Sequence, residues 1–170
     1  KDMILGQDIK NKVDVLVSEI LSSEFVGEGI QTTILDAKKR FLKKNGRMVP
    51  EGGSIMIALV ENTDSLAKEI FADNALGYDI REFNSITPNK SVTTLQEEPI
   101  LLSNPIEAFN FDFQKLQKVH QDKKIIEIRA KRDGQCAGVI QWLKVNLYED
   151  IEYQNDPVEM YRSNSVSGWR

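Results

Sequence analysis

The sequence is poor in the residues on which many metal and redox sites depend. It has one cysteine, Cys136, and one histidine, His120, among 170 residues. A single cysteine cannot form an internal disulfide, so a reducing compartment fits the chain best. Structural zinc sites use clusters of cysteine and histidine, and we therefore expect no metal centre. His120 lies in the polar stretch KVHQDKK, which is typical of a solvated loop.

Long apolar runs and strongly basic blocks are also missing. No stretch approaches the roughly 20 apolar residues that a membrane helix needs, and the first residues lack the order of a signal peptide. The 22 basic and 26 acidic residues leave a net charge of −4 at pH 7. The lysines of DAKKRFLKK are attributed to the end of a helix, whose dipole they complement. We expect a cytoplasmic protein, with the nucleus as the alternative, that binds neither nucleic acid nor membrane.

The first part of the chain has the pattern of an α/β domain. The run VDVLV (13–17) predicts a strand buried on both faces, as in a parallel sheet covered by helices. Apolar residues then recur at helical spacing from Ile30 to Leu42, and Asn45-Gly46 predicts the helix end. A parallel strand needs parallel neighbours, and few residues precede this one. We therefore expect the chain to be a fragment of a longer protein.

Beyond Pro50 the chain is predicted to be mainly β. The expected elements are strands over 54–61, 97–103 and 106–113, a helix over 64–73 that Asp64 could cap, and a hairpin over 123–150 that turns at Asp133-Gly134. Alternation in the second arm of the hairpin places Leu143 and Val145 on the core face, and Trp142 on the other face is interpreted as packing. The polar stretch near 77–96 predicts a protruding arm. The fold class is α+β, with a boundary between residues 49 and 50.

Two glutamates mark the connection between the first strand and the helix. Glu19 follows the strand and Glu28 precedes the helix, nine residues later in the sequence. Ligands of open α/β sheets gather beyond the carboxyl ends of the strands, which is where Glu19 falls. Two facing carboxylates can hold a guanidinium, share acid and base roles, or bind a hard cation. The cation is the weakest of these options, because such sites usually add Asp or Asn at short spacing.

A purely structural account of the same residues stays open. Helix N-termini favour a hydroxyl cap followed by an acid in the first turn, and Ser18, Glu19 and Glu28 could meet that need. Ser22 and Ser23 could form hydrogen bonds inside the connection. Spacing alone does not choose between the structural account and a catalytic one.

The sequence of this region resembles that of the protein arginine methyltransferase family. The segment VDVLVSEILSSEFVGEG, followed by ILDAKKRFLKKNGRMVP, is similar to the double-E loop of that family and the helix after it. The Gly-Glu-Gly ending is most similar to the branch that contains protein arginine methyltransferases 7 and 9. The later stretches LGYDI and RAKRDGQCAGVIQWLKVNLYED resemble the entry to the family's dimerisation arm and a long hairpin of its barrel domain. The resemblance covers most of the chain.

The resemblance implies a domain plan and an activity. Residues 1–49 would end a Rossmann-like methyltransferase domain, and residues 50–170 would form a β-barrel-like substrate domain with an arm near 77–96. Glu19 and Glu28 would clamp a substrate arginine while S-adenosylmethionine donates a methyl group to it. The arm would join a homodimer or a tandem pseudo-dimer. The substrate would be an arginine-containing protein or peptide.

Two departures from the family pattern matter. The family has a Thr-His-Trp loop where this sequence has Ser167-Gly168-Trp169, so Trp169 could line the substrate pocket without the histidine. No glycine-rich loop precedes Val13, so the main cofactor site is expected upstream of the fragment. The fragment alone should neither bind S-adenosylmethionine nor act as an enzyme.

Two other functions stay open at this point. One is a non-catalytic relative that binds peptides or acts as a scaffold, which the altered Ser-Gly-Trp sequence allows. The other is an unrelated hydrolase with paired carboxylates about 5 to 9 Å apart around a sugar-sized cleft. The sequence does not reveal the methylated product or the natural substrate.

Overall fold

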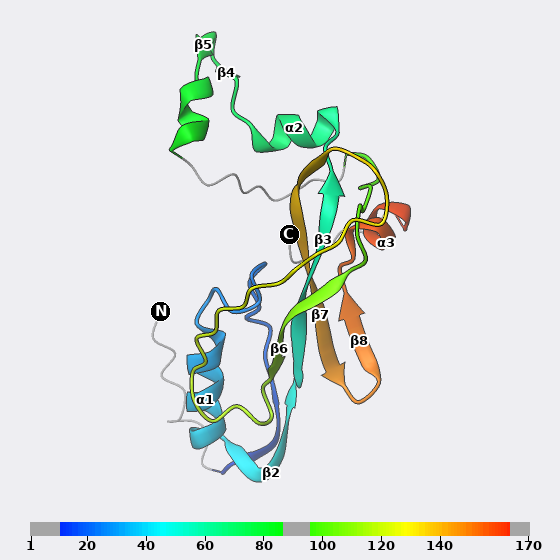
Figure 1. Ribbon diagram of the computed structural model, residues 1–170. Helices are drawn as coiled ribbons and strands as arrows, with labels where there is room; N and C mark the ends of the chain where they lie inside the picture. The colour runs from blue at the N-terminus through cyan, green and yellow to red at the C-terminus, as the bar shows by residue number, and fades with distance from the viewer. Residues whose placement is uncertain (1–10, 87–95, 164–170) are drawn as a thin grey trace.

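The chain has a mixed α/β fold, seen in a computed structural model that describes residues 11–86 and 96–163. In chain order the elements are β1 (Val13–Val17), α1 (Ile30–Arg40), β2 (Leu42–Val49), β3 (Gly52–Glu61), α2 (Asp64–Ile70), β4 (Asn74–Ala75), β5 (Tyr78–Asp79), the 3-10 helix η1 (Arg81–Ser85), β6 (Ile106–Asp112), β7 (Cys136–Tyr148), β8 (Ile151–Gln154) and α3 (Pro157–Arg162). Figure 1 shows them along an elongated molecule, with α1, β1 and β2 at one end and β4 and β5 at the other. None of the helices in these described ranges is long and apolar enough to cross a membrane.

The first unit consists of two parallel strands connected through a helix. Strand β1 pairs in parallel with β2, and α1 lies between them in the chain. The predicted strand over 13–17 and the helix that begins at Ile30 are confirmed. The expected burial of β1 on both faces is wrong for the described part of the chain, since Val15 and Val17 are 50% and 72% exposed. Within the described residues β1 pairs with β2, and one of its faces keeps the apolar side chains of Val15 and Val17 open.

The end of α1 differs from the prediction. The helix stops at Arg40, and the expected stop at Asn45-Gly46 lies inside β2. Pairing with β1 therefore overrides the helical spacing of residues 41–44. Gly46 serves a close approach of the chain, because a Cβ there would lie 2.6 Å from the side chain of Leu42 and 3.0 Å from the backbone oxygen of Asp14.

The second unit is a four-stranded antiparallel sheet in the order β6-β3-β7-β8. The predicted strands over 54–61 and 106–113 are confirmed as β3 and β6. Leu143 and Val145 on β7 are buried as expected, while Val139 on the same predicted face is 56% exposed. Trp142, on the other face, is also buried. The described strands form an open sheet and not a closed barrel, so the barrel-like expectation is not confirmed.

The predicted hairpin over 123–150 is wrong in its first arm. No strand covers residues 123–130 apart from an isolated bridge between Ser103 and Ala130, and Ile125 is 99% exposed. Strand β7 pairs with β3 and β8 instead. Its long antiparallel pairing with β3 takes the place of the expected hairpin partner. The strand expected over 97–103 is reduced to isolated bridges at Leu101 and Ser103.

The main core lies between α1 and one face of the sheet. It includes Ile30 and Ile34 from the helix, Met48 from β2, and Leu143 and Val145 from β7. The helical stripe and the alternating strand thus meet face to face, as a two-layer fold requires. This core fixes the position of the connection that precedes α1.

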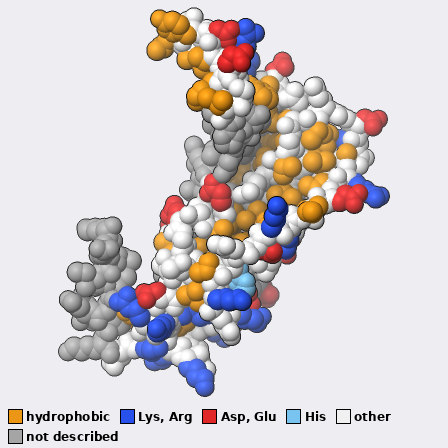
Figure 2. All heavy atoms as spheres, turned by 60° about the vertical axis from the view of Figure 1, so that its left-hand side comes forward, with side chains coloured by type: hydrophobic (Ala, Val, Ile, Leu, Met, Phe, Trp, Pro, Cys, Tyr) orange, Lys and Arg blue, Asp and Glu red, His pale blue; other side chains and the backbone are white. Residues whose placement is uncertain are grey.

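The far end of the molecule is formed by what we call the distal segment (residues 71–86). It contains the short β4–β5 pair and η1, and it projects beyond α2 (Figure 1). Figure 2 shows hydrophobic side chains at its surface, and Leu76, Tyr78 and Ile86 are 98%, 75% and 77% exposed. The predicted arm near 77–96 is described only up to residue 86; residues 87–95 lie outside the described part. The helix predicted over 64–73 begins at Asp64 but ends at Ile70, and Thr63 and not Asp64 is its N-cap.

Candidate active site

The connection between β1 and α1 is here named the acidic loop (residues 18–29). It leaves the carboxyl end of a strand with a parallel partner, the place where open α/β sheets bind ligands. Its first residue is fixed, because the Ser18 backbone N–H donates to the Val49 oxygen at 2.9 Å. Glu19 and Glu28 lie near its two ends, and both are exposed. The two carboxylates are therefore accessible to a ligand.

Hydrogen bonds within the acidic loop fold it tightly. The backbone N–H of Phe25 donates to the Ser22 carbonyl at 2.8 Å, and that of Gly27 donates to the Ser22 hydroxyl at 2.7 Å. A Cβ at Gly27 would lie 2.6 Å from the same hydroxyl, so a larger residue does not fit. The Ser23 hydroxyl donates to the Glu24 carboxylate at 3.2 Å. The predicted structural role of the two serines is confirmed.

The helix-cap account of the glutamates fails. The N-cap of α1 is Gly29, with φ 72°, and it makes no side-chain capping bond. The first turn of α1 contains no acidic residue, because Glu28 comes before the cap. No helix begins directly after Ser18, so Ser18 is not an N-cap. Its hydroxyl is buried and has no hydrogen-bond partner in the described structure. The exposed glutamates therefore have no capping role that would explain them.

A crossing segment (residues 113–126) fastens α1 to the sheet. The Lys38 ammonium donates to the carbonyls of Phe113, Gln114 and Leu116 at 2.9, 2.7 and 3.0 Å. Burial lowers the pKa of Lys38 below its usual value, although Asp112 acts in the opposite direction. Gln31 adds two bonds to the backbone of residue 120. The helix after the acidic loop is thus held along its length.

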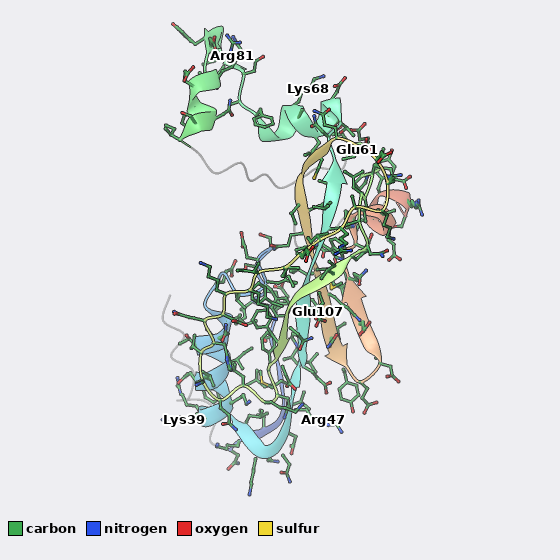
Figure 3. The ribbon with its side chains drawn as sticks, in the orientation of Figure 1. Lys39, Arg47, Glu61, Lys68, Arg81 and Glu107 are labelled. Atoms are coloured by element: carbon green, nitrogen blue, oxygen red, sulfur yellow. The ribbon has the colours of Figure 1, made fainter. Side chains whose placement is uncertain are left out.

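Charged groups elsewhere form exposed pairs rather than a second site. Figure 3 shows Lys39 and Arg47 at the end of the molecule formed by α1 and β2, and Arg81 at the opposite end. Arg47 pairs with Glu149 at 3.3 Å and Arg81 with Asp79 at 2.6 Å. Within residues 11–86 and 96–163, no three His, Cys, Asp or Glu side chains are grouped closely enough to hold a metal ion.

One pocket lies at the far end of β3 from the acidic loop. Its volume is about 30 Å³, enough for a water-sized molecule, and its lining includes Val60, Leu66, Pro99 and Ile140. It is small, and it lies at the Val60–Glu61 end of β3, whereas the acidic loop contacts β3 at Gly53. It adds nothing to the chemistry of the acidic loop.

Two expected features of the site cannot be located. Trp169 lies outside the described residues, and the cofactor-binding residues were expected upstream of this chain. The sequence did not indicate Phe25 and Gln141, which contact the sheet or the acidic loop, or Gln31, which holds the helix after the loop. Phe25 could have been noticed, because it is the only aromatic residue between Ser18 and Gly29.

The similar proteins found by comparison with known sequences and structures are arginine methyltransferases. No protein-family model matches the chain. The chain is similar to protein arginine N-methyltransferase 7 of Oryza sativa subsp. indica, with 31% identity over 96% of this chain. Arginine N(omega)-methyltransferase of Streptomyces achromogenes subsp. streptozoticus is 27% identical to this chain. That match includes 96% of this chain and 45% of the Streptomyces protein. The chain spans 25% of the length of the Oryza relative.

A solved structure has the same fold. It is the Trypanosoma brucei protein arginine N-methyltransferase 1 enzyme-prozyme heterotetrameric complex with AdoHcy, and it matches with a TM-score of 0.62. The match has 16% identity and covers 88% of this chain and 49% of the other. At this identity the likeness describes the arrangement of helices and strands.

Proposed function

Because this chain is similar over 96% of its length to arginine methyltransferases, we propose that it is part of an enzyme that methylates arginine. The methyl group would come from S-adenosylmethionine and go to a nitrogen of the guanidinium group. The observation that carries the proposal is the pair of exposed glutamates, Glu19 and Glu28, on a connection that leaves the carboxyl end of a parallel strand. Neither glutamate caps the helix that follows.

The chemistry assigned to the two glutamates is positioning and electrostatics. A guanidinium is planar and offers paired N–H donors, so two carboxylates can fix its orientation as one cannot. Their negative charge keeps the bound group cationic until it reacts, and the pair then stabilises the charge on the methylated product. When the methyl group is transferred, a guanidinium N–H proton is released. Holding the nucleophilic nitrogen in line lowers the entropic cost of the reaction.

S-adenosylmethionine supplies the methyl group when it is bound. No glycine-rich loop precedes β1 in the 170 residues. We therefore assign no residue of this chain to the cofactor. The isolated 170-residue chain is expected to be inactive.

The domain plan and the remaining site residue are part of the same proposal. Residues 1–49 would close a methyltransferase domain and residues 50–170 would form the substrate domain, whose described strands make an open sheet. Trp169 would line the substrate pocket, in the place where the family has the end of its Thr-His-Trp loop. The cytoplasm, or else the nucleus, is the proposed location.

We further propose that the distal segment takes part in pairing of two copies or of two tandem halves. Its apolar side chains, among them Leu76 and Tyr78, are exposed in the single chain. The family resemblance of the sequence implies this role for the arm, and the Trypanosoma brucei relative is a heterotetrameric complex. A homodimer or a tandem pseudo-dimer would cover these side chains.

The test is methyl transfer by the intact protein with Glu28→Gln. Glutamine keeps the shape of the side chain but removes the charge that holds the guanidinium. We expect kcat to fall by about 100-fold or more, with S-adenosylmethionine affinity unchanged. Glu24→Gln is the matched control, since it makes the same change inside the acidic loop at a residue outside the proposed clamp, and it should retain most activity.

The substrates should include an arginine peptide and free L-arginine, because one relative is named for protein arginine and another for arginine alone. Mass analysis of the product identifies the methylated form. Turnover by Glu28→Gln at the wild-type rate would contradict the proposal. Peptide binding without turnover by the wild-type protein would favour the non-catalytic relative.

A further inference from the structure

The acidic loop contains a residue in an unusual backbone conformation. Phe25 has φ 65°, in the left-handed region that side-chain-bearing residues seldom adopt, and it is 0% exposed. Such a conformation costs free energy and persists where the surrounding contacts determine it. The conformation of Phe25 therefore points to strong contacts with the rest of the molecule.

Those contacts come from the sheet of the second unit. The ring of Phe25 stacks on Phe111 of β6, with centroids 5.0 Å apart and planes inclined by 15°. It also lies 5.6 Å from the ring of Phe113. Aromatic pairs at these distances stabilise each other beyond simple burial. A loop residue of the first unit is thus inserted into an aromatic cluster that belongs to the second.

The sheet leaves room for this ring through a glycine. A Cβ on Gly53 of β3 would lie 2.7 Å from Cε2 of Phe25 and 2.8 Å from its Cζ. Two such atoms cannot approach so closely, so the Phe25 ring occupies the space that a side chain at residue 53 would need. The glycine in β3 and the phenylalanine in the acidic loop fit together.

A second contact fixes the loop at its middle. The Gln141 side chain of β7 donates from Nε2 to the backbone oxygen of Ser23 at 3.1 Å. Gln141 is exposed and lies on a strand adjacent to β3. The acidic loop is therefore attached to the sheet at two points, through Phe25 and through Ser23, both between Glu19 and Glu28.

We propose that Phe25 and Gln141 are positioning residues for the arginine substrate. They hold the acidic loop against the sheet of residues 52–154, and they thereby set where Glu19 and Glu28 present their carboxylates. The proposal rests on the proposed function of those two glutamates. It makes the second unit part of the substrate clamp, although neither Phe25 nor Gln141 contacts the guanidinium.

The experiment compares two variants with matched controls in the intact protein. Phe25→Leu shortens the aromatic anchor, and Phe109→Leu makes the same change on β6, where Phe109 packs at the edge of the core. Gln141→Ala removes the bond to Ser23, and Gln154→Ala removes an exposed glutamine from β8. Each protein is studied by hydrogen exchange of residues 19–28, by methyl-transfer kinetics with an arginine peptide, and by S-adenosylmethionine binding.

Phe25→Leu should raise exchange in residues 19–28 and raise the KM for the peptide by about tenfold, because small displacements of a clamp have large effects. Gln141→Ala should raise that KM by about two- to fivefold, in keeping with the loss of one exposed hydrogen bond. Cofactor affinity should stay unchanged in both. The two controls should leave loop exchange and peptide KM at wild-type values.

The outcomes separate this inference from the proposed function. If Phe25→Leu keeps wild-type exchange and KM, or if Phe109→Leu has the same effects, the positioning role is overturned. If Phe25→Leu does not fold, Gln141→Ala decides, because its side chain is on the surface. A wild-type protein without methyl transfer would contradict the proposed function, while loop exchange would still test the anchoring.

Discussion

The acidic loop and the distal segment show two ways in which a connection can carry apolar residues. The acidic loop has no helix or strand, yet Leu21 and Phe25 are buried in the main core. The distal segment has regular structure in β4, β5 and η1, yet Leu76 is 98% exposed. Regular backbone structure and burial are thus separate properties in this molecule.

The two regions are stabilised by different kinds of contact. The acidic loop is fixed by contacts to residues far away in the sequence, such as Phe111 and Gln141. The distal segment is fixed by short-range bonds, such as those between Asn84 and residue 72. A region held by local bonds can keep its shape and still leave exposed apolar side chains for another surface. The predictions below test this contrast.

The largest contrast is expected for truncation of an apolar side chain. Ile34→Ala, in α1 beside the acidic loop, should lower the free energy of unfolding by about 2 to 5 kcal/mol, because the side chain is 1% exposed. Leu76→Asn, in the distal segment, should change it by less than about 0.5 kcal/mol. Urea unfolding of the two variants measures both values. Equal losses would show that the distal segment is covered within its own chain.

Two glycines, one in each region's surroundings, have different constraints on their backbone and packing. An added Cβ at Gly53 would lie 2.3 Å from the Lys144 oxygen, so Gly53→Ala should cost about 1 to 3 kcal/mol through overpacking. Gly77 has open space around it but φ 89°, so Gly77→Ala should cost only about 1 kcal/mol of backbone strain. Thermal unfolding measures both. A larger effect at Gly77 would contradict the difference in packing.

Self-association provides a third test. Leu76 has φ 54°, a conformation that asparagine tolerates well, so Leu76→Asn removes an exposed apolar group and keeps the hairpin. We expect about tenfold weaker dimerisation, on the scale of one apolar side chain at an interface. Sedimentation equilibrium measures the association. Val139→Asn, an exposed site on β7, is the control, and an equal loss there would argue against the distal segment as the interface.

The smallest expected effect concerns two carboxylates. Burial acts to raise the pKa of Asp112 on β6, but hydrogen bonds from Lys115 outweigh it and hold that pKa below its usual value. Since the folded-state pKa is the lower one, this carboxylate stabilises the fold above its unfolded pKa, and the stability is lost as the pH falls through the folded pKa. Asp112→Asn should therefore flatten the stability profile in the acid range, as measured by urea midpoints.

Asp79 in the distal segment is the counterpart of Asp112. Hydrogen bonds from Arg81 lower its pKa, and the pair is fully on the surface. Salt should therefore return the pKa of Asp79 toward its usual value more than that of Asp112. Titration followed by NMR at low and high salt measures the two shifts. An equal response to salt would remove this distinction between the two regions.

Much of the fold was predictable from local patterns. The run at 13–17, the helical spacing from Ile30 and the alternation of β6 each predicted an element that the structure contains. The end of α1 at Arg40 was not predictable, because residues 41–44 continue the helical spacing, and those from Leu42 on form a strand only once β1 is their neighbour. The same reason applies to β7, whose partner β3 is far away in the sequence.

The candidate site was predictable only in part. Glu19 and Glu28 were found because charged residues at a strand end and before a helix form a visible pattern. Phe25 and Gln141 were not found, because their importance depends on the contacts with Phe111 and Ser23 that only the folded chain creates. The gap left for Phe25 by Gly53 has no local sequence signature either.

The contact between Gln31 and residue 120 has a practical consequence. The Gln31 side chain accepts a hydrogen bond from the backbone N–H of His120 at 2.7 Å and donates one to its carbonyl at 3.2 Å, so the imidazole takes no part. Any residue with a backbone N–H can therefore stand at this place. With Cys136→Ser, a cysteine introduced there could carry a fluorophore on a side chain that is already exposed. The dye would then show whether the crossing segment separates from α1 under a given condition.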